Sequence, residues 1–118
     1  MNNIISIDDF NNITKQSESK PVFLFKHSTR CGVSAAAWQE FDAFMSEIAA
    51  GDNSVDFSRV LVVEDRPTSL KIAETTKVPH QSPQVMLIRK GNVVWHTSHW
   101  AITKSKLHEA LSTFAESV

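Results

Sequence analysis

Short apolar runs alternate along this chain with longer segments in which apolar residues recur every three or four positions. The runs Val22–Phe25 and Val60–Val63 predict two strands that are buried on both faces. Between them, Gly32–Ala50 carries apolar residues at helical spacing, and Gly51 suits the position just after a helix. The first half of the chain therefore predicts a strand, a long amphipathic helix and a second strand.

Shorter helices are predicted from the residue types at their ends. Ser6 with Asp9 three residues later has the form of a capping box, which opens a short N-terminal helix. A helix over Pro67–Lys77 begins with a proline, which suits a first turn, and Pro79 ends it. Thr103 is a suitable N-cap for a C-terminal helix.

A hairpin is predicted in the second half of the chain. The apolar stretches Val85–Ile88 and Val93–Trp95 flank Lys90–Asn92, which contains the glycine and asparagine of a tight turn. After the N-terminal helix the order becomes βαβαββα, which predicts a mixed four-stranded sheet with helices on both faces. This α/β arrangement is the plan of the thioredoxin-like fold. We expect Trp95 and Trp100 to pack against helices.

Composition restricts the class of protein. The chain has 118 residues, 42% of them hydrophobic and 21% charged, with a formal net charge of −1. These values predict one globular domain over residues 1–118 and give no reason to expect nucleic acid or a membrane as a partner. The first residues lack the basic and apolar regions of a secretory signal, so we expect a cytoplasmic protein, and a monomer.

Cys31 is the only cysteine, and it stands where the first predicted strand gives way to the long helix. The positive end of the helix dipole and the unpaired N–H groups there stabilise a thiolate, and Arg30 adds a fixed positive charge beside it. A small buried core residue is the alternative interpretation. The polar neighbours favour a reactive thiol, so we predict that Cys31 is catalytic.

The residues around Cys31 predict exchange without a second thiol. Ser34 occupies the place of the resolving cysteine in a Cys-x-x-Cys motif, so a mixed disulfide on Cys31 must be resolved by a small thiol from solution. Ser34 either donates a weak hydrogen bond to the sulfur or caps the helix.

Pro83 stands directly before the third predicted strand, and with Cys31 upstream we expect the bond between Ser82 and Pro83 to be cis. Ser82 would then offer its N–H and C=O to a bound thiol; a plain turn proline is the alternative.

Five histidines invite a metal hypothesis, but their spacing does not support one. The chain has neither paired Cys-x-x-Cys nor His-Glu-x-x-His spacing, so we predict no metal site and no bound cofactor. His27 precedes Cys31 and either tunes it when protonated or only bonds to backbone. His99 either contacts substrate or is solvated, and His108 is expected on the exposed side of its helix.

Three segments carry a resemblance to a known family. Lys26–Ala37 contains the cysteine, His80–Gln84 contains the proline that precedes the third strand, and Val94 with Trp95 is followed by His99. A nucleophilic cysteine after the first strand with a proline before the third resembles the thioredoxin superfamily, in which a cis proline faces the cysteine. The combination more narrowly resembles the monothiol bacilliredoxin family.

The resemblance implies an activity and a co-substrate. It implies removal of bacillithiol from the cysteines of thiol-modified cytosolic proteins, with glutathione as the competing small thiol. Contacts from Ser82, Arg30 and His99 would discriminate between the two. The chain departs from the family's usual Thr-Cys-Pro-Ile-Ser by carrying Arg30 before the cysteine and Gly32 after it.

Two other functions remain open from the sequence. Cys31-Gly32-Val33-Ser34 resembles the Cys-Gly-Phe-Ser of monothiol glutaredoxins that carry iron–sulfur clusters, but their Gly-Gly-x-Asp segment is absent, and Gly91-Asn92 is predicted to form the hairpin turn instead. A thioredoxin-fold adaptor without catalysis is the third possibility.

Overall fold

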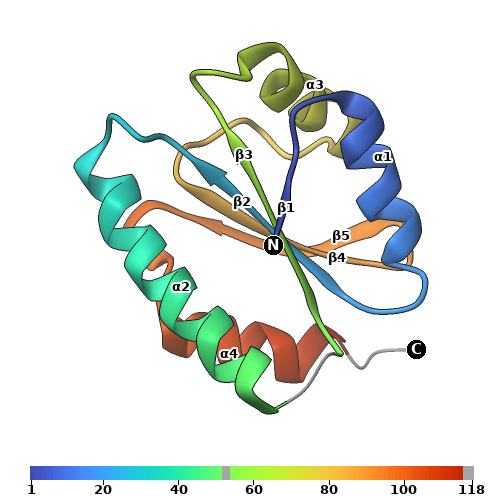
Figure 1. The fold of residues 1–118 in the computed structure, drawn as a ribbon, viewed down its shortest axis with the longest axis vertical. Helices are drawn as coiled ribbons and strands as arrows, with labels where there is room; N and C mark the ends of the chain where they lie inside the picture. Colours follow the sequence, from blue (N-terminus) through green and yellow to red (C-terminus); the bar gives the residue numbers. More distant parts are fainter. Residues whose placement is uncertain (52–53, 116–118) are drawn as a thin grey trace.

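The computed structural model describes residues 1–51 and 54–115 and shows a central sheet with helices on both faces (Figure 1). The strands are β1 (Asn2–Asn3), β2 (Val22–His27), β3 (Asp56–Leu61), β4 (Gln84–Arg89) and β5 (Asn92–Ser98). The helices are α1 (Ile7–Gln16), α2 (Gly32–Gly51), α3 (Arg66–Thr76) and α4 (Lys104–Ala110). A 3-10 turn, His99–Ala101, follows β5, and a π turn, Leu111–Ala115, follows α4.

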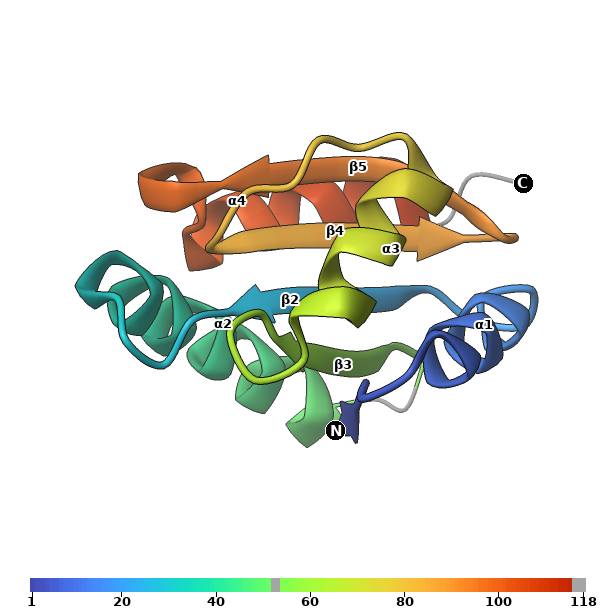
Figure 2. The same cartoon turned by 90° about the horizontal axis from the view of Figure 1, so that it is seen from above.

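The sheet has the order β1-β3-β2-β4-β5. The strands β1, β3 and β2 run parallel, while β4 is antiparallel to both β2 and β5. Helices α2 and α4 lie on one face and α1 and α3 on the other, as the two views together show (Figures 1 and 2). The predicted α/β thioredoxin-like fold is confirmed.

The sheet contains one strand more than the four predicted. Asn2 and Asn3 pair with Ser58 and Arg59 of β3, which makes β1 a two-residue edge strand. Two exposed asparagines carry no apolar alternation, so the hydrophobic pattern could not reveal this strand.

Strand β3 also begins and ends earlier than the predicted Val60–Val63. It spans Asp56–Leu61, because Ser58 and Arg59 pair with β2 although they are polar. Val62 has already left the strand, although its N–H donates to the His27 carbonyl at 2.9 Å, and Val63 is exposed.

The predicted N-caps Ser6 and Thr103 are confirmed, whereas Gly51, expected just after the long helix, belongs to α2. Ser6 and Asp9 form a capping box at α1, since each side chain bonds to the other's backbone N–H. Helix α2 ends at Gly51, and α3 is closed by Lys77, whose φ of 63° is left-handed. The Thr103 hydroxyl accepts a hydrogen bond from the N–H of Lys106 at the start of α4.

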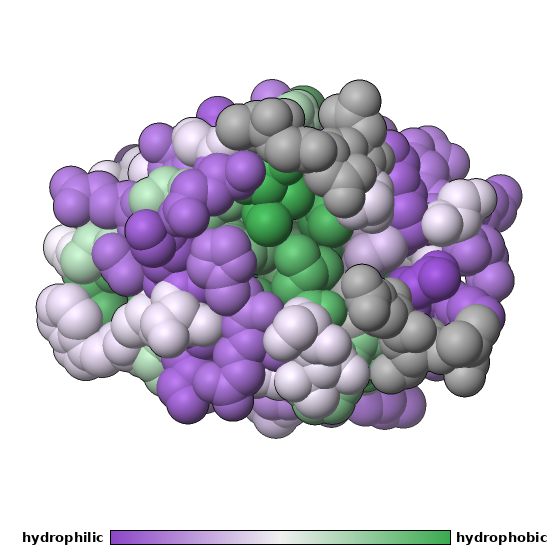
Figure 3. All heavy atoms as spheres, turned by 90° about the horizontal axis from the view of Figure 1, so that it is seen from below, coloured by the Kyte–Doolittle hydropathy of each residue, from purple (hydrophilic) through white to green (hydrophobic). Residues whose placement is uncertain are grey.

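The two faces of the sheet bury two separate apolar clusters. The cluster under α2 and α4 is rich in aromatic rings from Phe23, Phe25, Phe41, Phe44 and Phe57. The cluster under α1 and α3 is mostly aliphatic. The face seen in Figure 3 is largely hydrophilic, with apolar surface visible at its centre. Among the described residues, none of the helices combines the length and apolarity needed to cross a bilayer.

Phe41 tests the energetic weight of the aromatic cluster. Its side chain is fully buried, and its ring lies 5.1 Å from that of Phe25 and 5.7 Å from that of Trp38, between centroids. We predict that Phe41→Ala lowers the free energy of unfolding by about 3–5 kcal/mol, because it removes buried area and leaves a cavity. Urea unfolding measures this loss.

The matched control is Val63→Ala, at a side chain that is 41% exposed. It should change the free energy of unfolding by no more than about 0.5 kcal/mol. Equal losses in both variants would contradict the assignment of Phe41 to the core.

Candidate functional site

Cys31 lies at the junction between β2 and α2. Strand β2 ends at His27, a short turn follows, and α2 begins at Gly32. The Cys31 N–H donates to the Ser28 carbonyl at 3.3 Å, and the Cys31 carbonyl accepts from the Ala35 N–H at 3.1 Å. Cys31 therefore holds the N-cap position of α2, and its side chain is partly exposed, as exchange with a thiol requires.

Two sources of positive charge adjoin Cys31, the N-terminus of α2 and the neighbouring Arg30. The first turn of α2 carries no acidic side chain, so nothing there opposes the positive end of the helix dipole. Arg30 is exposed and adjacent in sequence. A Cβ added at Gly32 would meet no atom within 4 Å, so the start of α2 is open to an incoming molecule.

Ser34 is fully buried and holds the junction together. Its hydroxyl oxygen accepts a hydrogen bond from the Ser28 N–H at 2.9 Å and lies 3.0 Å from Nδ1 of His27. A hydroxyl that accepts from Ser28 retains one proton, which it can donate to the unprotonated Nδ1 of a neutral His27. These contacts fix the turn between β2 and α2. The Ser34 hydroxyl, which stands where a dithiol enzyme has its resolving cysteine, therefore has a structural role.

His27 packs its ring between aromatic neighbours. The ring centroids of Phe25 and Trp38 lie 5.5 Å and 5.3 Å away. Burial lowers the pKa of His27, and the positive charge of Arg59 lowers it further, against a smaller opposite effect of Glu64. His27 is therefore neutral at pH 7 and acts through its hydrogen bond to Ser34, which argues against its interpretation as a protonated neighbour of Cys31.

The loop before β4 contains the predicted proline bond. The peptide bond between Ser82 and Pro83 is cis, and Pro83 is buried. The Pro83 carbonyl accepts a hydrogen bond from the His99 N–H at 3.0 Å, which ties this loop to the turn after β5. The Ser82 hydroxyl is buried without a hydrogen-bond partner among the described residues.

The register of the sheet brings the segments that carry Cys31, Pro83 and His99 to the same end of the strands. Lys26 of β2 pairs with Gln84 of β4, and Gln84 pairs with Ser98 of β5. The turn that carries Cys31, the loop that ends at Pro83 and the turn that begins at His99 therefore adjoin the same row of residues. Figure 2 shows the three segments together at the left end of the sheet.

A family model described as monothiol bacilliredoxin matches residues 2–107, which is most of the chain. The chain belongs to this family. The expected resemblance is thus confirmed, and it places a single cysteine in a thioredoxin fold.

Solved structures agree with the thioredoxin fold. A thioredoxin-fold protein described as a candidate oxidoreductase is 34% identical, with a TM-score of 0.81, and the match covers 92% of this chain and 91% of that one. The thioredoxin of Fasciola hepatica is 19% identical with a TM-score of 0.74, covering 95% and 97% of the two chains. The thioredoxin of Malassezia sympodialis is 24% identical with a TM-score of 0.72, covering 95% and 88%. The last two show the fold alone.

One tryptophan outside the sequence-predicted site is placed differently from expectation. Trp100 is 71% exposed and does not pack against a helix, whereas Trp95 packs against the aromatic cluster as expected. The His108 side chain is 43% exposed, while its ring meets that of Phe44 at 4.8 Å and its Nε2 lies 3.7 Å from Glu47. His99 itself is exposed, with a left-handed φ of 55°.

Sequence reasoning missed Lys26 and Gln84 of this bacilliredoxin. Both side chains are buried on the α3 side of the sheet, directly below the loop that ends at Pro83. Burial lowers the pKa of Lys26 to about 8. The available signal was a lysine at the end of the apolar run Val22–Phe25, where a side chain of that parity must point into the layer that holds Val22 and Leu24.

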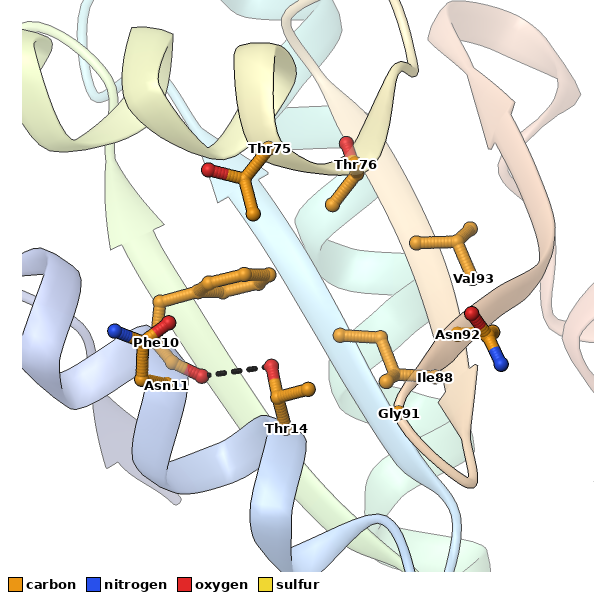
Figure 4. Close-up of a pocket in the computed structure, with 9 residues that line it drawn as sticks. All are labelled: Phe10, Asn11, Thr14, Thr75, Thr76, Ile88, Gly91, Asn92 and Val93. Atoms are coloured by element: carbon orange, nitrogen blue, oxygen red, sulfur yellow. Dashed lines mark hydrogen bonds between the residues drawn. The ribbon is translucent and has the colours of Figure 1, made fainter.

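Two other features of the bacilliredoxin chain add no chemistry to this edge. No group of three or more His, Cys, Asp or Glu side chains among the described residues could hold a metal ion. A hollow lined by Phe10, Thr14, Thr75 and Gly91 lies between α1, the end of α3 and the hairpin turn (Figure 4). It is at the opposite end of the sheet, because Val22 there pairs with Ile88.

Ser34 gives a test of the junction. We predict that Ser34→Ala lowers the free energy of unfolding by about 1–3 kcal/mol, because it leaves the Ser28 N–H and the His27 ring without their partner. Urea unfolding measures the loss. Ser112→Ala is the matched control, since that hydroxyl is exposed on a helix end and donates only to the Glu109 carbonyl. A loss no larger than that of Ser112→Ala would contradict the role of Ser34 in holding the turn.

The two partly buried histidines His27 and His80 predict a pH dependence of stability. Burial lowers the pKa of both His27 and His80 below the ordinary value of 6.5. At pH values between the pKa of the folded state and that of the unfolded state, the unfolded chain binds more protons than the folded one. The free energy of unfolding is therefore highest above pH 6.5 and falls as the pH drops below it. Urea unfolding at pH 7.5 and 5.5 measures the fall. The double variant His27→Gln/His80→Gln should lose less stability over this range, and an unchanged pH dependence would contradict the prediction.

Proposed function

We propose that this bacilliredoxin is a monothiol thiol–disulfide oxidoreductase that removes bacillithiol from mixed disulfides on thiol-modified cytosolic proteins. One observation carries the proposal above all. The only cysteine of the chain caps the N-terminus of α2 with its side chain partly exposed, while the position of a resolving cysteine holds a buried serine engaged with the turn.

The chemistry follows in two exchange steps. The Cys31 thiolate attacks the bacillithiol sulfur of the mixed disulfide, the client cysteine leaves as a thiolate, and a disulfide forms between Cys31 and bacillithiol. A second bacillithiol thiolate then attacks the sulfur of the bound bacillithiol. Bacillithiol disulfide leaves, and the Cys31 thiolate is regenerated. Overall one disulfide is exchanged for another: the client cysteine is released as a thiol, and one free bacillithiol is consumed in forming bacillithiol disulfide.

The other residues of the edge have supporting roles in this proposal. Arg30 and the N–H groups of α2 stabilise the Cys31 thiolate as leaving group and nucleophile. The backbone of Ser82, preceding the cis bond to Pro83, offers hydrogen bonds to the bound thiol. His99 is exposed beside Pro83 and contacts the substrate.

The cycle predicts one reversible adduct. Exposure of the purified protein to bacillithiol disulfide should add the mass of a single bacillithiol, and excess free bacillithiol should remove it. Cys31→Ser should abolish both steps, because it removes the attacking sulfur. Ser34→Ala is the matched control and should still form the adduct, since no resolving role belongs to it. Mass spectrometry of the intact protein measures each state.

Parallel arms separate the other functions. Faster adduct formation with glutathione disulfide than with bacillithiol disulfide would indicate that glutathione, and not bacillithiol, is the co-substrate. Visible absorbance that depends on Cys31 after anaerobic reconstitution with iron, sulfide and bacillithiol, together with no exchange, would indicate an iron–sulfur cluster carrier that dimerises, since each chain offers one cysteine to a cluster that needs four ligands. The absence of both exchange and colour would indicate an adaptor.

A further inference from the structure

Lys26 is a charged residue in the interior of the protein. Its side chain is 0% exposed, and it lies on the face of β2 that packs against α1 and α3. Lysine is almost never fully buried unless its ammonium is paired. The partners of that ammonium therefore indicate what it does.

The ammonium joins three segments of the chain. Lys26 Nζ donates a hydrogen bond to the Ser69 carbonyl at 3.1 Å and lies 3.2 Å from Nδ1 of His80. Ser69 belongs to the N-terminal half of α3, and His80 stands three residues before Pro83. Burial and the nearby charge of Lys26 lower the pKa of His80, so its ring is neutral at pH 7 and Nδ1 can accept the bond.

The same loop is tied down by a second side chain. Gln84 pairs with Lys26 across the sheet, and its Nε2 donates to the Pro79 carbonyl at 3.1 Å. The loop between Pro79 and Gln84 is thus held from β2 through Lys26 and from β4 through Gln84. This anchor lies on β2, and Cys31 follows it by five residues, after the strand has ended at His27.

We propose that Lys26 is a positioning residue, whose buried ammonium holds His80 against α3 and thereby fixes the loop that leads into Pro83. Its effect on exchange rests on the proposed function, because the loop then presents Ser82 and Pro83 to the thiol bound at Cys31. Its effect on the loop itself is independent of that function.

A purely structural lysine is the competing explanation. A methionine would fill the space of the lysine stem without an ammonium to desolvate, so packing alone does not call for a charge here. The ammonium instead has acceptors to meet, since Nζ lies 3.1 Å from the Ser69 carbonyl and 3.2 Å from Nδ1 of His80. These acceptors suit a cation. Of the two, His80 lies in the loop between α3 and β4, so its contact with the ammonium is the one that bears on the loop.

Lys26→Met tests the proposal. The variant should fold, and kcat/KM toward a bacillithiol-modified peptide should fall about tenfold, mainly through KM, because a displaced loop misaligns the bound disulfide. Alkylation of Cys31 by iodoacetamide, which needs no such loop, should keep its rate. Lys71→Met is the matched control, since that lysine is exposed on α3 and pairs with Glu74. It should leave both rates unchanged.

His80 gives a second, independent arm. His80→Ala should reproduce the fall in kcat/KM, and His80→Asn should restore most of it, because the Asn Oδ1 takes a place close to that of Nδ1 and accepts the same bond. A structural role alone would not distinguish these two variants by KM. This pair decides the question should Lys26→Met fail to fold.

Hydrogen exchange of the backbone amides at Gln81 and Ser82 separates this proposal from the function. Faster exchange there in Lys26→Met or His80→Ala than in the wild type or Lys71→Met supports the anchor even when the wild-type protein shows no thiol exchange. Folded variants with wild-type amide protection in the loop and wild-type kcat/KM would overturn the proposal.

Discussion

The antiparallel pairing of β2 with β4 is the constraint on which the candidate site depends. Because Lys26 pairs with Gln84, the end of β2 must lie beside the start of β4. The turn that carries Cys31 follows the first strand, and the cis bond at Pro83 precedes the second. Two segments about fifty residues apart in sequence are thus brought to one edge by backbone hydrogen bonds, with no contribution from the side chains of the site.

The alternation of side chains along β2 assigns a different task to each face. Phe23, Phe25 and His27 point into the aromatic layer under α2, whereas Val22, Leu24 and Lys26 point into the layer under α3. Each series is apolar until its last member. His27 then bonds to Ser34 in the turn before α2, and Lys26 bonds toward α3 and His80. The core on either face therefore ends in a polar contact that holds a loop of the site.

Much of the fold could be predicted because its signals are local. The hairpin is marked by its turn residues, with Gly91 at a φ of 81°, and the helices by their capping side chains. Apolar runs identified β2 and β4 well but misplaced β3, whose Ser58 and Arg59 are polar although Ser58 is fully buried. Strand β1 has only two residues, too few for a period to show.

The candidate site was predicted in part for the same reason. The place of Cys31 at a helix start follows from residues adjacent in sequence, whereas the cis bond before Pro83 is expected from the position of the proline before the third strand together with the upstream Cys31. The partners of Ser34, His27 and Lys26 depend on how turns fold back, and no spacing rule specifies which of several acceptors a buried donor reaches. Trp100 failed for the opposite reason, because residue type predicts burial although an exposed turn after β5 carries it.

The engagement of Ser34 bears on how a monothiol site differs from a dithiol one. In a Cys-x-x-Cys site the second position supplies a thiolate that attacks the mixed disulfide on the first sulfur. Here that position is fully buried, and its hydroxyl contacts His27 and the Ser28 N–H, so it contributes rigidity to the turn instead of reactivity. On the proposed cycle the second thiol then comes from solution, which requires an open approach to the sulfur. The partly exposed Cys31 and the empty space around Gly32 meet that requirement. A rigid turn held by Ser34 and an open approach at Cys31 and Gly32 are therefore two separate features that together suit a monothiol cycle.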